Sequence, residues 1–317
     1  MSATSSISST ERKKVTTLAF RQKKQAGEPI TMLTAYDYPT AYAMDRAGID
    51  SILVGDSLGM VVLGYENTLP VTMDDMLHHC RAVARGARYA LLIGDMPFMS
   101  YQASVSDAVR NAGRFLQQAG MDAVKLEGGR ERVDAVRAIV GAGIPVMGHL
   151  GLTPQSVHQL GGFRAQGRTL PAARRLLEDA LELQEAGCFS IVLEAVPARL
   201  AELVSRRLEV PTIGIGAGAG CDGQVLVTHD LLGLFDRFTP KFVRKYANLH
   251  AEIGRAFEEY IADVISGDFP APEHTIDMPD EEWDALIDIF PVAPSDGASL
   301  ATRLHRRNRE DTGLRSE

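Results

Sequence analysis

Short apolar runs alternate with longer stretches of helical periodicity from about residue 30 to residue 229. The runs are rich in Val, Ile and Leu, which is typical of strands buried on both faces. The stretches between them carry apolar residues at helical spacing, and several start at a Ser or Thr and stop at a Gly. The predicted strands are 30–35, 51–56, 89–95, 123–127, 145–149, 190–194, 211–215 and 224–229. The predicted helices include 38–47, 105–119, 130–142, 171–186 and 198–207, and one more begins after Thr72.

The helices and strands are joined by short turns, and the same Ala-Gly step connects helix to strand at residues 47–51, 119–123 and 186–190. Repeated strand–helix units with joints this short build a parallel sheet with right-handed crossovers. Eight such units favour a closed barrel over an open doubly wound sheet. We therefore expect an α/β fold, a (β/α)8 TIM barrel.

The two ends of the chain differ from this repeating part. A helix within residues 11–27 could close one end of the barrel, and residues 1–11 look like a loose N-terminus. We expect the catalytic barrel to span 12–267, ending in a charged amphipathic helix at 240–266. Residues 268–317 would form a C-terminal extension, with a short helix at 281–290 whose apolar face, including Trp283, contacts its own barrel or a neighbouring subunit.

Composition restricts the class of protein. Hydrophobic residues make up 45% of the 317 residues, and no apolar run approaches the roughly 18–20 residues that span a bilayer. The net charge of −8 without a long basic stripe argues against nucleic acid as a partner. Cys80, Cys188 and Cys221 lie far apart, which argues against a disulfide framework or a zinc knuckle. The first residues do not resemble a secretory signal, so we expect a cytoplasmic protein with no membrane partner.

Polar residues gather where the predicted strands end. Because the carboxyl ends of barrel strands open onto one face, these residues should converge. Crowded carboxylates repel one another, whereas a divalent cation turns that repulsion into binding, and hard oxygen donors favour Mg²⁺ over Zn²⁺. A set of capping residues or buried ion pairs is the alternative, and for three acids at neighbouring strand ends we prefer a metal site. The residues at the exits are Asp56 with Ser57, Asp95, Lys125 with Glu127, His149, Glu194, and His229 with Asp230.

Three of these side chains have more than one interpretation. Lys125 could bind an anionic substrate, form a Schiff base with a ketone, or pair with Glu127. Glu194 suits a base or proton relay, although a hydrogen bond to a loop explains a single acid equally well. His149 could be an auxiliary site residue or a core histidine bonded to a backbone carbonyl.

A glycine-rich run at residues 214–220 invites comparison with a dinucleotide fingerprint. A strand is predicted after it, where the fingerprint requires a helix, so a dinucleotide site is not expected. We interpret these glycines as allowing the backbone to approach a ligand closely.

A series of segments in collinear order resembles the ketopantoate hydroxymethyltransferase (3-methyl-2-oxobutanoate hydroxymethyltransferase) family over residues 12–275. Each piece alone is weak, but the ordered series is specific. The segments are Thr34-Ala35-Tyr36-Asp37, Val54-Gly55-Asp56-Ser57-Leu58-Gly59-Met60, Gly94-Asp95-Met96-Pro97-Phe98-Met99, Val124-Lys125-Leu126-Glu127-Gly128-Gly129, Gly148-His149-Leu150-Gly151-Leu152-Thr153-Pro154-Gln155 and Gly214-Ile215-Gly216-Ala217-Gly218.

The resemblance implies a barrel of the phosphoenolpyruvate/pyruvate type that transfers a hydroxymethyl group from 5,10-methylenetetrahydrofolate to 3-methyl-2-oxobutanoate. The product would be 2-dehydropantoate, for pantothenate and coenzyme A biosynthesis, made through a Mg²⁺-stabilised enolate. It further implies that the chain forms homodecamers. Carried over residue by residue, it assigns Mg²⁺ to Asp56, Asp95 and Glu127, substrate binding to Asp56, Ser57, Asp95 and Lys125, and proton transfer to Glu194.

Other functions remain open at this point. A Mg²⁺-dependent carbon–carbon lyase acting on a 2-oxo acid, a Schiff-base aldolase, and a barrel that only binds a metabolite would share most of these features. The resemblance also leaves about the last forty residues without an explanation, because members of the family end soon after a segment like Phe269–His274.

Overall fold

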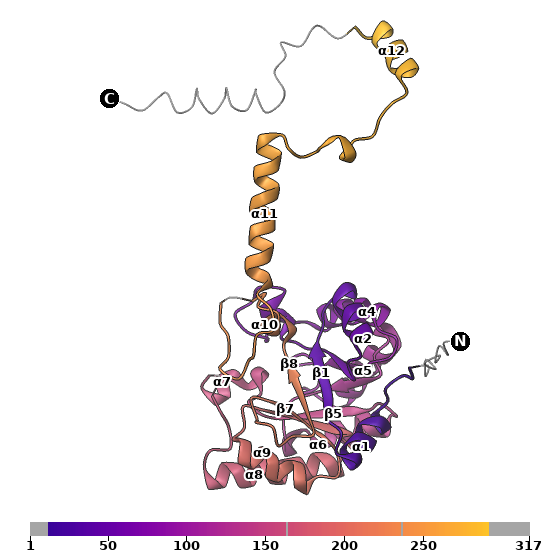
Figure 1. Ribbon diagram of the computed structural model, residues 1–317. Helices are drawn as coiled ribbons and strands as arrows, with labels where there is room; N and C mark the ends of the chain where they lie inside the picture. Colours follow the sequence, from indigo (N-terminus) through magenta and orange to yellow (C-terminus); the bar gives the residue numbers. More distant parts are fainter. Residues whose placement is uncertain (1–11, 163, 236, 292–317) are drawn as a thin grey trace, which may run out of the picture. The chain divides into compact units, whose positions relative to one another are not determined.

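Eight parallel strands close into a barrel in which every strand pairs with its neighbours in sequence and β8 pairs with β1 (Figure 1). This computed structural model describes residues 12–162, 164–235 and 237–291. The predicted (β/α)8 TIM barrel is confirmed. The strands are β1 (Ile30–Thr34), β2 (Ser51–Val54), β3 (Leu91–Asp95), β4 (Ala123–Lys125), β5 (Val146–Gly151), β6 (Ser190–Glu194), β7 (Thr212–Ile215) and β8 (Gly223–Leu226).

Helices connect most of the strands, and a large apolar layer lies between them and the barrel wall. The helices that follow strands are α2 (Tyr38–Ala47), α3 (Leu58–Val61), α4 (Met73–Gly86), α5 (Val105–Ala119), α6 (Val133–Gly141), α7 (Val157–Leu160), α8 (Leu170–Glu185), α9 (Ala198–Arg207) and α10 (Thr228–Leu231). Three 3-10 turns are η1 (Arg130–Arg132), η2 (Pro154–Ser156) and η3 (Pro272–His274). The remaining helices are α1 (Thr17–Ala26), α11 (Leu249–Ser266) and α12 (Asp280–Ile289).

The barrel interior is filled by alternate residues of the strands. Leu91 and Ile93 of β3 point inward, as do Ala123 of β4, Met147 of β5 and Val192 of β6, and all are buried in one cluster. Phe20 of α1 is fully buried in the same cluster, so α1 closes the barrel as an N-terminal capping helix. Because side chains alternate along a strand, the next inward positions lie two residues further on, at the carboxyl ends.

Capping residues in the sequence correctly predicted where several helices begin or end. The helix predicted at 38–47 is α2, and Gly48 after it adopts φ 95°, a conformation that suits Gly at a helix end. Thr72 begins α4 with a reciprocal pair of hydrogen bonds to Asp75. Ser104 accepts a hydrogen bond from the backbone of Asp107 at the start of α5.

Several predicted boundaries differ from the structure by two residues, and two predictions were wrong in a way that changes an element. The strand predicted at 224–229 ends at Leu226, and His229 lies in α10 instead. The helix predicted at 240–266 begins only at Leu249. In the first case the apolar pattern continues from a strand into the helix after it, and in the second it continues from a loop into a helix. Periodicity alone therefore cannot show where the helix begins. The short helices α3, α7 and α10 were missed, since four residues are too few to show a helical period.

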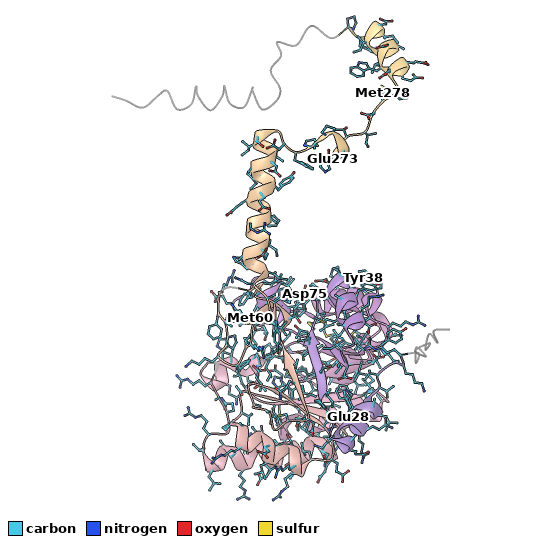
Figure 2. All side chains as sticks on the ribbon, viewed as in Figure 1. Glu28, Tyr38, Met60, Asp75, Glu273 and Met278 are labelled. Atoms are coloured by element: carbon cyan, nitrogen blue, oxygen red, sulfur yellow. The ribbon has the colours of Figure 1, made fainter. Side chains whose placement is uncertain are left out.

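The chain divides into two compact units, Met1–Ala247 and Asn248–Glu317. The first contains the whole barrel. The second contains α11, η3 and α12, so its boundary lies before α11, twenty residues ahead of the predicted extension at 268. Among the described residues, no helix combines the length and apolarity needed to cross a bilayer. Side chains are drawn over the described parts in Figure 2.

Candidate functional site

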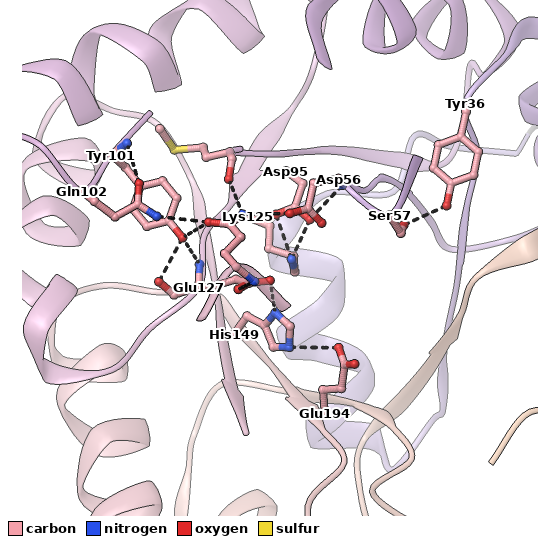
Figure 3. Close-up of polar contacts among 12 residues, drawn as sticks. Tyr36, Asp56, Ser57, Asp95, Tyr101, Gln102, Lys125, Glu127, His149 and Glu194 are labelled. Carbon is pink, nitrogen blue, oxygen red and sulfur yellow. Dashed lines mark hydrogen bonds and ion pairs between the residues drawn. The ribbon is translucent and has the colours of Figure 1, made fainter. Parts of the chain in front are cut away.

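At the carboxyl end of the barrel, the inward-facing positions of the strands are occupied by polar side chains. Asp95 follows Leu91 and Ile93 in this series, Lys125 follows Ala123, His149 follows Met147, and Glu194 follows Val192. They line a cavity of about 500 Å³ together with Asp56, Ser57 and Glu127. The convergence of the predicted strand-end residues is therefore confirmed for these side chains (Figure 3). Asp230 also lines the cavity, whereas His229, in α10, is not among its lining residues.

The closest pair in the site joins Lys125 to Asp95. These residues are direct partners across β3 and β4, and Nζ of Lys125 donates to both carboxylate oxygens of Asp95 at 2.8 and 2.7 Å. Burial by itself would lower the pKa of Lys125, but the charges of Asp95, Glu127 and Asp56 outweigh it and raise that pKa. Lys125 is thus a fully charged ammonium group in the site.

Asp56 lies next to this pair. Its backbone N–H donates to Oδ2 of Asp95 at 3.3 Å, and its own Oδ2 accepts a hydrogen bond from Nε2 of Gln155 at 3.0 Å. The side chain of Asp56 is 4% exposed. Burial and the negative charges of Asp95 and Glu127 raise the pKa of Asp56 well above its usual value. Burial also raises the pKa of Asp95, although Lys125 opposes that shift. The site therefore carries more negative charge than Lys125 alone can balance.

His149 lies between two acids. Its Nδ1 is 3.4 Å from Oε1 of Glu127, and its Nε2 is 3.3 Å from Oε2 of Glu194. Burial and the charge of Lys125 would lower the pKa of His149, but the two carboxylates outweigh both effects and raise it to about 9. The charged imidazole is held by ion pairs at distances too long for well-formed hydrogen bonds. Accordingly, both ring nitrogens and Oε1 of Glu127 have no hydrogen-bond partner among the described residues.

Ser57 lines the same cavity. Its hydroxyl is 2.9 Å from the hydroxyl of Tyr36, which follows β1 and is buried. Glu194 is more accessible than the other acids, with 17% of its side chain exposed, so it faces the open part of the cavity.

The side chains present suit a hard divalent cation better than a soft one. Three buried carboxylates, one of them with an oxygen that lacks a hydrogen-bond partner, share a cavity with one buried lysine, Lys125. In the described residues, no three His, Cys, Asp or Glu side chains are already gathered closely enough to hold a metal ion by themselves. Lys125 and Gln155 instead occupy oxygens of Asp95 and Asp56. The metal assignment is thus compatible with the donor set and stays a prediction.

Two glycines of the run after β7 pack closely against neighbouring parts of the chain. A side chain at Gly216 would collide with the ring of Phe242, with a closest approach of 2.6 Å, and one at Gly218 would collide with Ala198 at 2.5 Å. Both glycines also have positive φ angles, 63° and 80°. At these two positions the glycines admit neighbouring parts of the chain, and the interpretation that the run admits a ligand stays a prediction.

Three polar contact residues were missed by sequence reasoning. Tyr36 contacts Ser57, while Tyr101 and Gln155 contact Glu127. Tyr36 and Gln155 belong to the segments that carry the family resemblance, but nothing in their local pattern assigns them a role. Tyr101 follows β3 in a loop, where no spacing rule places it near β4.

The cavity is also lined by a segment after α10. It contributes three aromatic rings and a lysine to the lining: Phe235, Phe238, Phe242 and Lys241. The exposed fraction of Phe238 is 67%. Charged side chains at the strand ends therefore line one part of the cavity, and mostly apolar side chains of this segment line another.

Comparisons with known proteins agree on one family. A family model described as "Ketopantoate hydroxymethyltransferase" matches residues 14–272. The chain is 62% identical over 263 residues to a 3-methyl-2-oxobutanoate hydroxymethyltransferase of Syntrophus aciditrophicus (strain SB), covering 83% of this chain and 97% of the relative. It is 60% identical over 273 residues to the protein with the same description from Syntrophomonas wolfei subsp. wolfei, covering 86% and 99%.

Solved structures with low sequence identity share the fold. A crystal structure of phosphonopyruvate hydrolase has a TM-score of 0.55 at 14% identity, covering 95% of this chain and all of that one. A crystal structure of 2,3-dimethylmalate lyase, described as a PEP mutase/isocitrate lyase superfamily member, has a TM-score of 0.53 at 14% identity, covering 89% and 97%. These structures therefore share the barrel fold with this chain.

Proposed function

Because the chain belongs to the ketopantoate hydroxymethyltransferase family and forms 2-dehydropantoate in pantothenate biosynthesis, we propose that the cavity at the ends of β2 to β6 carries out this reaction. One observation supports this most directly. Asp56, Asp95, Lys125 and Glu127 are buried side by side in one cavity, with the more accessible Glu194 at its open side. The substrate is the 2-oxo acid 3-methyl-2-oxobutanoate, and the proposed one-carbon donor is 5,10-methylenetetrahydrofolate.

Asp56 and Asp95 would hold a Mg²⁺ ion, with Glu127 as a third ligand or as the acceptor for a bound water. The excess of buried negative charge supports this assignment, since a cation would relieve the repulsion that raises the pKa of Asp56. When bound, Mg²⁺ supplies positive charge that stabilises the negative charge developing on the keto oxygen of the substrate.

Lys125 and Ser57 would bind the substrate. The ammonium group of Lys125 offsets the charge of the substrate carboxylate, and Asp95 holds Lys125 in place through two hydrogen bonds. The hydroxyl of Ser57, held by Tyr36, would donate to a substrate oxygen. Asp56 and Asp95 would contact the same end of the substrate.

Glu194 would accept the proton from C3 of 3-methyl-2-oxobutanoate. The electron pair left on C3 then forms the new carbon–carbon bond to the methylene carbon of the folate. The bonds from that carbon to the folate nitrogens break, a water molecule supplies the hydroxyl oxygen of the product, and tetrahydrofolate is the leaving group. His149 contacts Glu194 from inside the barrel and, as a cation, would keep that carboxylate ionised and oriented toward the cavity. His149 therefore acts as an auxiliary residue.

A Schiff base at Lys125 does not suit this site. A lysine acts as a nucleophile only when its amine is neutral, and its activation normally depends on a lowered pKa. The pKa of Lys125 is raised, because the carboxylates around it outweigh the effect of burial. Both relatives described above are hydroxymethyltransferases, so a lyase activity is not favoured by them.

Exchange of the C3 proton tests this function. The full-length protein is incubated in D₂O with 3-methyl-2-oxobutanoate and Mg²⁺, without folate, and the C3 signal is followed by NMR. We expect exchange that stops with EDTA and in the Glu194→Gln variant. Exchange that proceeds equally in that variant would remove Glu194 as the base. Product formation that does not depend on methylenetetrahydrofolate would instead contradict the proposed donor.

We further propose that the chain forms a homo-oligomer, a decamer by its family resemblance, and that it works in the cytoplasm. The unpaired Cys80, Cys188 and Cys221 support a reducing compartment. The exposed apolar residues of α11, among them Phe257 and Ile261, support contact with another subunit.

A further inference from the structure

Gln155 has no role in the proposed mechanism, and it lies next to the proposed metal site. It belongs to η2, just after β5, and is 5% exposed. A buried glutamine is costly unless all its polar atoms are hydrogen-bonded. In this protein both polar atoms of its side chain are hydrogen-bonded, to partners that follow β2 and β3.

The side-chain amide of Gln155 bridges the ends of β2 and β3. Its Nε2 group donates to Oδ2 of Asp56 at 3.0 Å and to the backbone oxygen of Met96, the residue after Asp95, at 2.9 Å. A side-chain amide nitrogen has two hydrogens, so both are used. The direction of the Asp56 carboxylate is therefore tied to the backbone that carries Asp95.

The other polar atoms of Gln155 reach the end of β4. Its backbone N–H donates to Oε2 of Glu127 at 3.0 Å. Its Oε1 accepts from the hydroxyl of Tyr101 at 2.7 Å and from Nε2 of Gln102 at 3.1 Å. Tyr101 in turn accepts from the backbone N–H of Glu127 at 3.1 Å, as Figure 3 shows.

This network allows only one orientation of the amide. If the oxygen and nitrogen of Gln155 exchanged places, the oxygen would face the carboxylate of Asp56 and the carbonyl of Met96, and both contacts would become repulsive. The hydroxyl of Tyr101 and the amide of Gln102 hold the oxygen on the other side. The side-chain amide of Gln155 is thus held in one orientation by its hydrogen bonds.

We propose that Gln155 is a positioning residue that sets the directions of Asp56 and Glu127 for cation and substrate binding. It fixes Oδ2 of Asp56 and Oε2 of Glu127, which leaves Oδ1 of Asp56 and Oε1 of Glu127 for the ligand. Oε1 of Glu127 has no hydrogen-bond partner among the described residues. Residues that orient metal ligands in this way usually change affinity or activity about 10–100-fold when they are replaced. This inference rests on the proposed function of the same cavity.

Gln155→Met tests it. Methionine matches glutamine in length and fills the same space, but it cannot donate to Asp56 or Met96. The affinity of the full-length protein for Mn²⁺ as a Mg²⁺ probe is measured by electron paramagnetic resonance without substrate, together with kcat, KM and melting temperature. We expect affinity for the metal to fall about tenfold or more, with a lower kcat, while the melting transition stays cooperative.

Gln102→Ala is the matched control. It removes one bond to Oε1 of Gln155 but leaves both Nε2 donors in place, so metal affinity should stay within about twofold of the parent protein. If Gln155→Met does not fold, Gln155→Asn carries the test, because the shorter amide cannot reach both Asp56 and Met96 from the same backbone position.

The outcomes separate this inference from the proposed function. Metal affinity and kcat/KM within twofold of the parent in a folded Gln155 variant would overturn the positioning role. A loss equal to that of Gln102→Ala would overturn it as well, since it would reflect general disturbance of the loop. If Asp56→Ala itself leaves metal affinity unchanged, the metal assignment fails whatever Gln155 does.

Discussion

Nε2 of His149 lies 3.3 Å from Oε2 of Glu194, and the two residues extend from neighbouring strands, β5 and β6. The contact brings a histidine with a pKa of about 9 against the carboxylate assigned as the proton acceptor. On its other side the same ring faces Glu127. The proposed proton transfer at Glu194 and the proposed metal binding at Glu127 would therefore be linked by the side chain of His149.

Replacing Glu194 by Gln should slow turnover about 100-fold or more while substrate binding changes little. The amide keeps the size of the side chain but cannot accept the C3 proton. We expect a lower kcat and an unchanged dissociation constant for 3-methyl-2-oxobutanoate, measured by calorimetry. Glu202→Gln on the surface of α9 is a matched control. Full activity of Glu194→Gln would remove this residue from the mechanism.

Replacing Asp56 by Ala should weaken Mg²⁺ binding by about tenfold or more. The change removes one of the two carboxylates that would hold the cation, along with the anion that Gln155 orients. Titration of the metal-free protein with Mg²⁺ measures the affinity, and the exposed Asp74→Ala serves as the control. An unchanged affinity would contradict the metal assignment, as would full activity in excess EDTA.

Lys125→Met should raise KM for the 2-oxo acid and lower kcat/KM about 100-fold or more, because the substrate carboxylate and Asp95 would both lose their partner. Treatment of the parent protein with substrate and borohydride should leave its mass unchanged. A stable adduct on Lys125 would show that the neutral amine reacts, in conflict with its raised pKa.

Asp230→Asn should stabilise the fold at neutral pH. Burial raises the pKa of Asp230 to about 6, so the folded state binds a proton more tightly than the unfolded chain does. The stability of the parent is then greatest below the unfolded pKa of about 4 and falls as pH rises to about 6.

The Asn variant lacks this titration. Its free energy of unfolding should therefore exceed that of the parent by about zero near pH 4 and by about 1 kcal/mol at pH 7. This value is smaller than the full pKa shift implies, because the group is partly solvated. Urea unfolding at pH 5, 6 and 7.5 measures the difference. A constant difference across this range would show that Asp230 does not titrate as described.

The apolar face of α12 should contact another surface of the protein or of a second subunit. Trp283 is 51% exposed, and Leu286 and Phe290 are exposed near it. Deleting residues 277–317 should reduce the oligomeric mass seen by light scattering or lower the melting temperature. Asp284→Ala is a control within the same helix. If the truncated protein keeps both mass and melting temperature, α12 has no such contact.

The sequence by itself determined the barrel and the positions of its strand ends. Buried parallel strands require nearly continuous apolar runs, and a carboxylate at the end of such a run needs a partner, so Asp56, Asp95 and Glu194 stood out without any structure. Helix starts and stops such as Thr72 and Gly48 were equally local, since each depends on one side chain or one backbone conformation.

Only the tertiary structure decided how these side chains pair. The register between strands and the path of the loops after them decide these contacts. They are the hydrogen bonds of Lys125 to Asp95, the ion pairs of His149 with Glu127 and Glu194, and the hydrogen bond of Gln155 to Asp56. Contacts of this kind link residues 22 to 99 positions apart, and their free energy is set by burial and geometry that no local pattern encodes. The glycines after β7 illustrate the same limit, because the neighbours that Gly216 and Gly218 admit, Phe242 and Ala198, come into contact with them only when the chain has folded.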